Sequence, residues 1–232
     1  MIVGRGMIAD AFSKYYDNKE VVIFASGVSN SLLNEECHFT RERELLKESI
    51  AKYPKSTIVY FGTCSVHDPE LSHSPYVEHK REMEKLIEKN CEKFFIFRLS
   101  QVVGHGSSPT LINFIVDHIK SGKSFNIWKN STRNLIDVDD VFKIADYLIQ
   151  NTIFMNEITN IATPLSLPIF DIVTIAEELI GKKGQYQVDN RGGSYEINIH
   201  KITPLLNNMN ITFDQTYPAL IIKKYFQMSL KS

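Results

Sequence analysis

The sequence predicts an α/β protein built on a parallel sheet that helices cover on both faces. Three observations support this class. Short apolar runs alternate with segments of helical period from the first residue onward. The apolar runs are nearly continuous, as in strands that are buried on both faces. The length of 232 residues allows one domain with a modest annex, and contents of 43% hydrophobic and 23% charged residues are ordinary for a globular chain.

The elements of the first half alternate strictly between strand and helix. We expect strands where apolar runs are short, and helices where apolar positions recur every three or four residues. The expected strands are 1–3, 21–25, 56–61 and 94–99, and the expected helices are 7–16, 41–53, 76–90 and 110–120. This alternation is typical of a parallel sheet.

The second half is less regular and predicts a smaller α+β lobe. Short strands are expected at 125–128 and 134–136, and helices at 139–150 and 168–180. The first of these helices has aspartates in its first turn, which the helix dipole favours. The second has Pro168 at its start and Gly181 just past its end. Two further elements, 196–206 and 215–226, are expected to close the chain.

The composition argues against several classes of partner. The net charge of −1 and the pI of about 6.7 predict neither nucleic acid nor a membrane as partner. No apolar run approaches the ~20 residues of a membrane span, and the chain opens on a strand without a signal peptide. Three scattered cysteines predict a reducing compartment, and the histidines show no metal-binding spacing. We therefore expect a soluble, cytoplasmic protein without a metal.

A glycine-rich loop joins the first strand to the first helix. It consists of Gly4, Arg5, Gly6, Met7, Ile8 and Ala9. A Gly-x-Gly-x-x-Ala loop at this place lets the backbone approach a pyrophosphate, although it can also be a plain turn. No acidic residue about 20 positions on is evident to hold a ribose hydroxyl, and Arg5 can instead pair with a 2′-phosphate. The loop therefore favours NADP as cofactor, with NAD as the alternative.

Small and hydroxyl residues follow two of the expected strands. Ala25, Ser26 and Gly27 end the second strand, and residues 62–65 (Gly-Thr-Cys-Ser) end the third. Such residues can be ordinary turn formers. They can also allow a ligand to approach the backbone at the carboxyl edge of a parallel sheet.

Tyr76 and Lys80 form a candidate proton-transfer pair. Four residues apart on a helix, they share one face, and a fixed cation lowers the pKa of a nearby phenol. Thr63, on the preceding strand, could hold a substrate oxygen against the phenol. With 10 tyrosines and 19 lysines in 232 residues, chance alone supplies about one such pair, and Tyr15 with Lys19 is a second copy without this context.

Together these segments resemble the short-chain dehydrogenase/reductase superfamily, in its extended branch that modifies nucleotide sugars (the NAD-dependent epimerase/dehydratase family). The resemblance covers nearly the whole chain and implies a Rossmann-like sheet. The glycine loop is similar to that of the GDP-fucose synthase-like reductases. The segments that carry the resemblance are 4–9, 59–66, 76–80, 97–104 and 133–140.

The resemblance also implies a role for each matching residue. Thr63, Tyr76 and Lys80 correspond to the catalytic residues, with Ser65 as the less favoured alternative to Thr63. Gly4, Arg5, Gly6, Met7, Ile8, Ala25, Ser26, Gly27, Lys80 and Leu99 would bind the cofactor. Ser65, Gln101 and Arg133 would bind the substrate, with Arg133 facing its diphosphate.

The chain departs from the family pattern in its length. It passes from the first strand and helix directly to a strand that resembles the family's fourth, so the strands on the adenosine side are expected to be missing. At about 30 residues per βαβ unit, this explains much of the shortness. We expect the nucleotide-binding domain at 1–105 plus 134–160, and the substrate lobe at 106–133 plus 161–232.

Three functions follow from these expectations. The first is NADPH-dependent reduction of a keto group on a nucleotide-activated sugar. The second is epimerisation of a nucleotide sugar with a tightly bound cofactor. The epimerising relatives with this glycine loop carry a cysteine where this chain has Ser65, which favours simple reduction. The third is binding of a nucleotide sugar or a protein without catalysis. Relatives usually dimerise through two helices per subunit, here 41–53 and 76–90, so a homodimer is expected.

Overall fold

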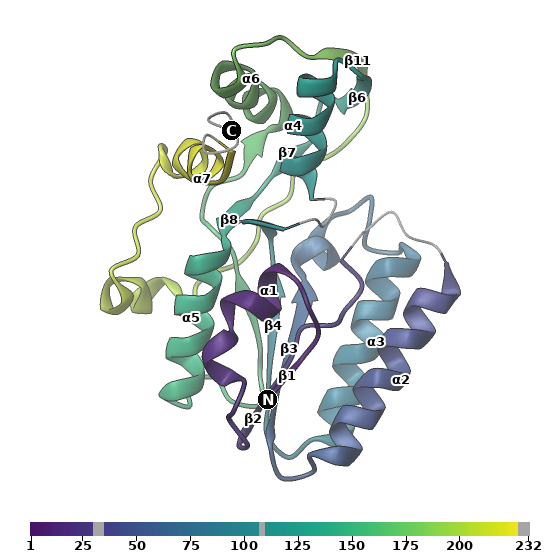
Figure 1. Ribbon diagram of the computed structural model, residues 1–232, viewed down its shortest axis with the longest axis vertical. Coiled ribbons are helices and arrows are strands. Elements are labelled where there is room, and N and C mark those ends of the chain that lie inside the picture. Colours follow the sequence, from purple (N-terminus) through teal and green to yellow (C-terminus); the bar gives the residue numbers. More distant parts are fainter. Residues whose placement is uncertain (30–34, 107–109, 227–232) are drawn as a thin grey trace.

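The computed structural model describes residues 1–29, 35–106 and 110–226. A five-stranded parallel sheet lies at its centre, as the sequence predicts (Figure 1). Its strand order is β1-β2-β3-β4-β9. The strands are β1 (Ile2–Val3), β2 (Val21–Phe24), β3 (Thr57–Thr63), β4 (Phe94–Leu99) and β9 (Ile158–Ile161). The alternation of strands and helices therefore gives the predicted class of fold.

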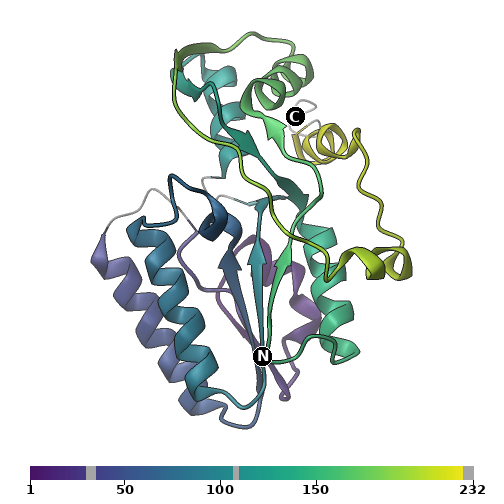
Figure 2. The same cartoon turned by 180° about the vertical axis from the view of Figure 1, so that it is seen from behind.

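Helices cover both faces of this sheet (Figures 1 and 2). On one face lie α2 (Glu36–Lys52) and α3 (Pro75–Asn90), and on the other α1 (Met7–Ala11), the 3₁₀ helix η1 (Ser13–Tyr15) and α5 (Val138–Gln150). Successive strand residues point to opposite faces. Ile58 and Tyr60 thus pack with Met83 of α3, whereas Val59 and Phe61 pack on the side of α5. Both faces of the strands are buried, which explains their continuous apolar runs.

The sheet ends at β1, which has two residues and pairs with β2 alone. In a complete dinucleotide-binding sheet, strands continue on both sides of the first strand. Within the described residues, no strand pairs with the outer edge of β1. The structure therefore agrees with the prediction that the strands on this side are missing.

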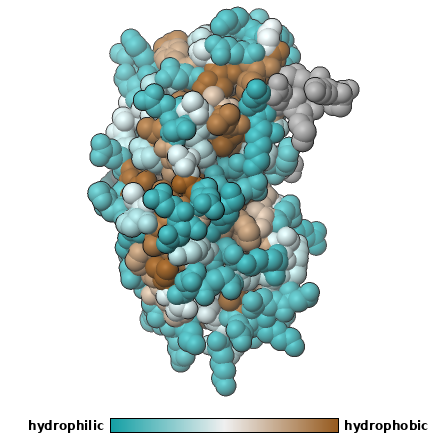
Figure 3. All heavy atoms as spheres, turned by 90° about the vertical axis from the view of Figure 1, so that its left-hand side faces the viewer, coloured by the Kyte–Doolittle hydropathy of each residue, from teal (hydrophilic) through white to brown (hydrophobic). Residues whose placement is uncertain are grey.

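A smaller lobe lies at the carboxyl edge of the sheet (Figure 1, upper part). It contains three two-stranded pairs, β5 with β8, β6 with β11, and β7 with β10. Its elements are β5 (Gln101–Val103), α4 (Leu111–Ser121), β6 (Ser124–Trp128), β7 (Thr132–Arg133), β8 (Leu135–Asp137), β10 (Leu167–Pro168), α6 (Ile169–Ile180), β11 (Gln185–Asp189) and α7 (Tyr217–Phe226). Figure 3 shows apolar side chains gathered over this lobe.

Helix α7 is fastened to the junction of β8 and α5. Asp137, which caps the N-terminus of α5, accepts hydrogen bonds from Tyr225 Oη (2.5 Å) and Lys224 Nζ (2.7 Å). Tyr217 Oη donates to Asp140 and accepts from the backbone N–H of Asp137. In the described part of the chain, neither this helix nor any other has the length and apolar character needed to cross a bilayer.

Several elements differ from those expected. The helix expected at 7–16 breaks at Phe12 into α1 and η1, and the helix expected at 41–53 begins earlier, at Glu36. The segment 196–206 is not one regular element. The Asn198 side chain accepts a hydrogen bond from His200 N and forms a local turn there, and the 3₁₀ helix η3 (Thr203–Met209) follows. Strands β5, β7, β9, β10 and β11 were not predicted.

Candidate active site

The carboxyl ends of the parallel strands bring the predicted site residues to one edge of the sheet. Thr63 ends β3 and lies in register with Leu99, which ends β4. Ser26 and Gly27 follow β2, the other neighbour of β3. Helix α3 begins nearby, with Pro75 in its first turn and Ser74 accepting a hydrogen bond from the backbone of Val77. This cap sets the first turn of α3, which carries Tyr76.

The structure brings Thr63, Tyr76 and Lys80 together. The Thr63 side chain lies near the phenol of Tyr76 and lowers its pKa. Lys80 Nζ lies 5.9 Å from the centroid of the Tyr76 ring, as expected one turn further along α3. The Tyr76 residue is only 7% exposed. A hydroxyl, a phenol and an ammonium therefore share one buried corner of the sheet edge.

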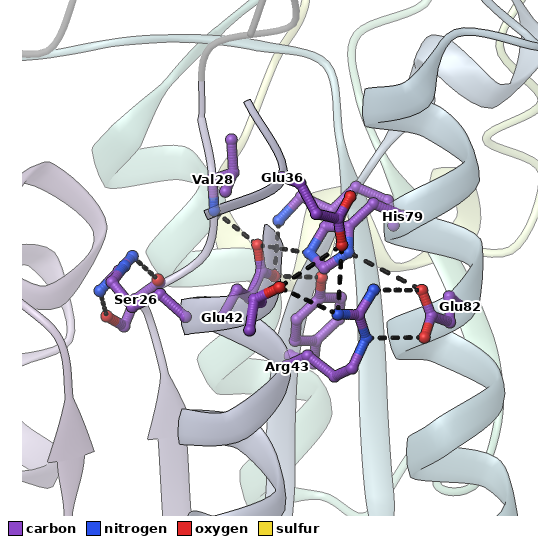
Figure 4. A network of polar contacts seen from close by, with 11 residues as sticks. Ser26, Val28, Glu36, Glu42, Arg43, His79 and Glu82 are labelled. Carbon is purple, nitrogen blue, oxygen red and sulfur yellow. Dashed lines mark hydrogen bonds and ion pairs between the residues drawn. The ribbon is translucent and has the colours of Figure 1, made fainter. Parts of the chain in front are cut away.

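The Lys80 ammonium forms an ion pair with a carboxylate that the sequence analysis did not identify. Lys80 Nζ lies 3.0 Å from Glu42 Oε1 of helix α2 (Figure 4). The two side chains are 3% and 0% exposed. Gly27 makes room for the pair, because a Cβ there would lie 2.5 Å from Lys80 Nζ. A larger residue at this position would therefore displace the Lys80 ammonium from Glu42.

Glu42 is surrounded by polar groups from helix α3, strand β3 and the loop that follows β2. Tyr60 Oη donates to it at 2.6 Å, the backbone N–H of Val28 donates at 2.6 Å, and His79 Nε2 lies at 3.1 Å. Burial raises the pKa of Glu42, but Lys80, His79, Tyr60 and Val28 outweigh burial, and the pKa falls well below its ordinary value. Glu42 is therefore ionised at neutral pH, and the pair carries no net charge.

A second ion pair ties the same helices together nearer the surface. Arg43 of α2 donates two hydrogen bonds to Glu82 of α3, at 2.8 and 3.0 Å (Figure 4). His79, whose ring stacks on Phe39, lies between this pair and Glu42. Charged side chains thus bridge α2 and α3 from their buried to their exposed sides.

The pKa of Tyr76 lies above the ordinary value of 10. Burial raises this pKa most, and the charge of Glu42 raises it further. Lys80 and the neighbouring Thr63 side chain lower it. Lys80 acts in the expected direction, but burial and Glu42 outweigh it. The phenol therefore keeps its proton throughout the neutral range.

A hollow of about 370 Å³ opens beside the glycine loop. It is lined by Gly4, Arg5, Ala25, Ser26, Gly27 and Arg41. Gly4 has a φ of +129°, and a Cβ there would lie 2.4 Å from the carbonyl oxygen of Ala25. Gly6 has a φ of +118° and open space where its Cβ would be. The loop thus presents bare backbone to the hollow, as a bound pyrophosphate requires.

Five of the predicted cofactor residues line the hollow, namely Gly4, Arg5, Ala25, Ser26 and Gly27. Met7 and Ile8 instead pack against the apolar core beneath the loop. Leu99 packs in the core of the sheet, Lys80 is buried against Glu42, and Gly6 is exposed. Arg41 of α2 joins the lining, although the sequence analysis did not identify it, and donates hydrogen bonds to Ser26 Oγ (3.2 Å) and Ser26 O (2.8 Å).

On the side of the smaller lobe, Tyr195 links two of the predicted substrate residues. Its phenol lies near the Ser65 side chain and within electrostatic reach of Arg133 on β7. Burial raises the pKa of Tyr195 to about 12. Gln101, at the start of β5, has a buried carbonyl oxygen without a hydrogen-bond partner among the described residues. Tyr195, which the sequence analysis did not identify, therefore lies beside two of the residues predicted to bind the substrate.

One of the missed residues had a signal in the sequence. Glu42 falls at helical spacing with Phe39, Leu46 and Ser49, and all four are buried in α2. A carboxylate at a core position of a helix implies a buried partner. Arg41 and Tyr195 had no comparable signal, because their contacts come from chain segments far away in the sequence.

A possible set of metal ligands lies outside this site. Glu35, Cys37 and His38 place ligand atoms within 4.8 Å of one another at the start of α2. All three residues are exposed, and such surface groups are common without an ion. Their contacts are local ones, with Glu35 Oε2 lying 3.4 Å from His38 Nε2 and 3.8 Å from Cys37 Sγ. We assign no metal to them.

A parallel sheet with a bare glycine loop at its first strand and a buried Thr-Tyr-Lys set at its third defines a class of dinucleotide-binding α/β enzymes. The chain belongs to the NAD dependent epimerase/dehydratase family, whose sequence pattern matches residues 9–162. The resemblance noted in the sequence is thereby confirmed. No curated protein sequence matches the chain.

Solved structures of similar fold include several that act on or bind nucleotide sugars. MoeE5, in complex with UDP-glucose and NAD, has a TM-score of 0.73 and 16% identity over 91% of this chain and 80% of that one. A dTDP-4-dehydrorhamnose reductase from Clostridium acetobutylicum has a TM-score of 0.70 and 13% sequence identity, and the match covers 96% of this chain and 86% of that one. A dTDP-glucose 4,6-dehydratase from Bacillus anthracis, in complex with NAD, has a TM-score of 0.70 and 18% sequence identity, and the match covers 99% of this chain and 79% of that one. At these identities the likeness shows the shared fold.

Proposed function

We propose that this protein reduces a keto group on a nucleotide-activated sugar, with NADPH as the preferred cofactor and NADH as the alternative. The observation that carries the proposal is the placement of Thr63 and Lys80 beside the phenol of Tyr76, at the carboxyl edge of the sheet. The printed names of the similar structures support it, since one is a reductase of a keto sugar nucleotide and another binds UDP-glucose and NAD.

Each residue has a part in this reaction. Thr63 hydrogen-bonds the carbonyl oxygen of the substrate and aligns it with the phenol. Tyr76, protonated at neutral pH, donates its proton to that oxygen as the alkoxide forms. The nicotinamide, when bound, supplies hydride to the carbonyl carbon. Arg133 binds the diphosphate of the substrate, and Tyr195 and Ser65 shape the sugar pocket beside it.

The cofactor is proposed to lie along the glycine loop. The bare backbone at Gly4 and Gly6 fits a pyrophosphate, and Leu99 at the end of β4 lies beside Thr63. The guanidinium groups of Arg5 and Arg41 face the same hollow and supply positive charge for a phosphate of the cofactor.

The test is the Tyr76→Phe variant. Removing the phenol hydroxyl removes the proton donor, and reduction of a keto sugar nucleotide should slow by about 10²–10⁴-fold. Consumption of NADPH, followed by absorbance, measures this rate. Tyr15→Phe is the matched control. Tyr15 belongs to the other Tyr-x-x-x-Lys of the chain, and its hydroxyl binds Asp146 on the opposite face of the sheet.

Equal rates for the parent and Tyr76→Phe would contradict the proposed mechanism. An epimerase with the same residues would give a different result in the parent protein. It would retain its cofactor through purification and show no net consumption of added NADPH.

One observation favours binding without catalysis as a second candidate. Lys80 points its ammonium at Glu42 and is almost completely buried, so contact with a nicotinamide ribose would require it to exchange partners. Calorimetry with NADPH, NADH and a nucleotide sugar separates the candidates. Binding of the sugar nucleotide without either cofactor would support the non-catalytic function.

A further inference from the structure

The hollow beside the glycine loop is flanked by two arginines on different elements. Arg41 is fixed in place by its two hydrogen bonds to Ser26. Arg5 is exposed and, within the described part of the chain, forms neither a hydrogen bond nor an ion pair with protein. A guanidinium group can form a bidentate hydrogen bond with a phosphate, so this hollow suits a phosphate ester.

The volume of the hollow, about 370 Å³, lies near the lower end of the 300–1,000 Å³ found for small-molecule sites. The adjacent helix α1 has only five residues. Its dipole can contribute little to anion binding, because the macrodipole is a sum over aligned peptide units. The positive charge at the hollow therefore comes mainly from the two arginines.

The sheet offers one half of a dinucleotide site. A dinucleotide-binding fold consists of two mononucleotide-binding halves, one on each side of the first strand. Here β2, β3, β4 and β9 all lie on one side of β1, and the described residues place no strand on the other. The half of the fold that would form a wall for the second nucleoside is thus missing, while the phosphate site and the half at Thr63 and Tyr76 are present.

We propose that this protein recognises its cofactor through one phosphate, held between Arg5 and Arg41, and through the nicotinamide nucleoside, and that the adenosine contributes little to binding. Reduced nicotinamide mononucleotide then binds nearly as well as the whole dinucleotide. This inference rests on the proposed use of a nicotinamide cofactor. It specifies which part of the cofactor the protein binds.

The experiment measures binding through the fluorescence of the reduced nicotinamide, without any turnover. The purified full chain is titrated with NADPH, NADH and reduced nicotinamide mononucleotide, and adenosine is added as a competitor. The same titrations are made with Arg41→Gln and with Lys47→Gln. Lys47 is the matched control, because it is exposed on the same helix and pairs only with Glu44.

The expected result has three parts. The mononucleotide binds within tenfold of NADH, millimolar adenosine displaces neither, and Arg41→Gln weakens the binding of both by about tenfold while Lys47→Gln leaves it unchanged. The inference is overturned if the mononucleotide binds more than tenfold more weakly than NADH, if adenosine competes, or if Arg41→Gln binds like the parent.

These outcomes are distinct from failure of the proposed function. If NADPH or NADH binds and is oxidised by a keto sugar nucleotide but the mononucleotide does not bind, only the inference about the adenosine is wrong. If no reduced nicotinamide binds at all, both the inference and the proposed reductase are wrong.

Discussion

At the scale of single residues, the decisive feature is the pairing of Lys80 with Glu42. A buried cation beside the phenol would by itself favour the phenolate. Glu42 cancels that charge, and its own burial is tolerated because four groups satisfy its oxygens. The Tyr76 phenol thus stays protonated at neutral pH, which is the state that the proposed reduction of a carbonyl needs.

The Glu42→Gln variant should be strongly destabilised. The substitution keeps the shape of the side chain but leaves the Lys80 ammonium buried without a counter-charge. Breaking a buried pair in this way costs about 3–5 kcal/mol. Urea unfolding followed by circular dichroism measures the change in the free energy of unfolding. Glu44→Gln, an exposed change on the same helix, should alter it by less than about 0.5 kcal/mol.

A double variant separates the charge from the packing. In Glu42→Gln with Lys80→Met, no unpaired ammonium remains, and much of the lost stability should return. If the double variant is as unstable as the sum of the two single variants, the ion pair is not the source of the effect.

The same pair predicts how stability depends on pH. The folded-state pKa of Glu42 lies below its ordinary value of 4.5, so its contribution is fully present above that pH. The contribution is lost as the pH falls below 4.5 towards the folded-state pKa. The parent should therefore lose more stability on acidification through this window than the Glu42→Gln variant does, as unfolding at a series of pH values would show.

At the scale of elements, helix α3 packs closely against strand β3 at a glycine, Gly62. Arg98 of β4 donates two hydrogen bonds to Glu84 of α3, at 2.9 and 2.6 Å. The pair lies against Gly62 of β3, where a Cβ would lie 2.7 Å from Glu84 Oε1. The glycine next to Thr63 is therefore a packing requirement, and it keeps α3 close to the strand that carries the candidate catalytic hydroxyl.

Gly62→Ala should destabilise the protein by about 1–3 kcal/mol, because the added methyl group displaces the Glu84 carboxylate from Arg98. Gly193→Ala is the control, since nothing lies within 4 Å of its Cβ position. Thermal unfolding of the two variants compares them directly. Equal melting temperatures would contradict the packing role of Gly62.

The elements of the sheet could be read from the sequence, whereas several contacts within the site could not. Apolar runs predicted four strands of the sheet, and the order of Thr63, Tyr76 and Lys80 along the chain placed them at one edge. The pairing of Lys80 with Glu42 depends on how α2 packs against α3, which no local pattern encodes. Tyr195 lies in an irregular segment, positioned by tertiary contacts alone.

At the scale of the whole molecule, the expected homodimer remains a prediction. Helices α2 and α3 lie side by side on one face of the sheet, where two subunits could form a four-helix bundle (Figure 2). Arg43 and Glu82 on these helices already pair within the chain, which leaves a polar surface. Light scattering at several protein concentrations tests the dimer. A mass of twice 26.6 kDa would support it, and a constant 26.6 kDa would contradict it.

The two ends of the candidate site differ in their access to water, and this has a consequence for ionic strength. Dissolved ions screen exposed charges over about 8 Å at physiological salt but reach buried pairs much less. Arg5 and Arg41 at the hollow are exposed, so dissolved ions screen their charges. Lys80 and Glu42 are buried, so their pair is screened much less. Under the proposed function, added salt should therefore weaken binding of the anionic cofactor at the hollow and leave proton donation by Tyr76 unchanged, so that ionic strength separates binding from chemistry.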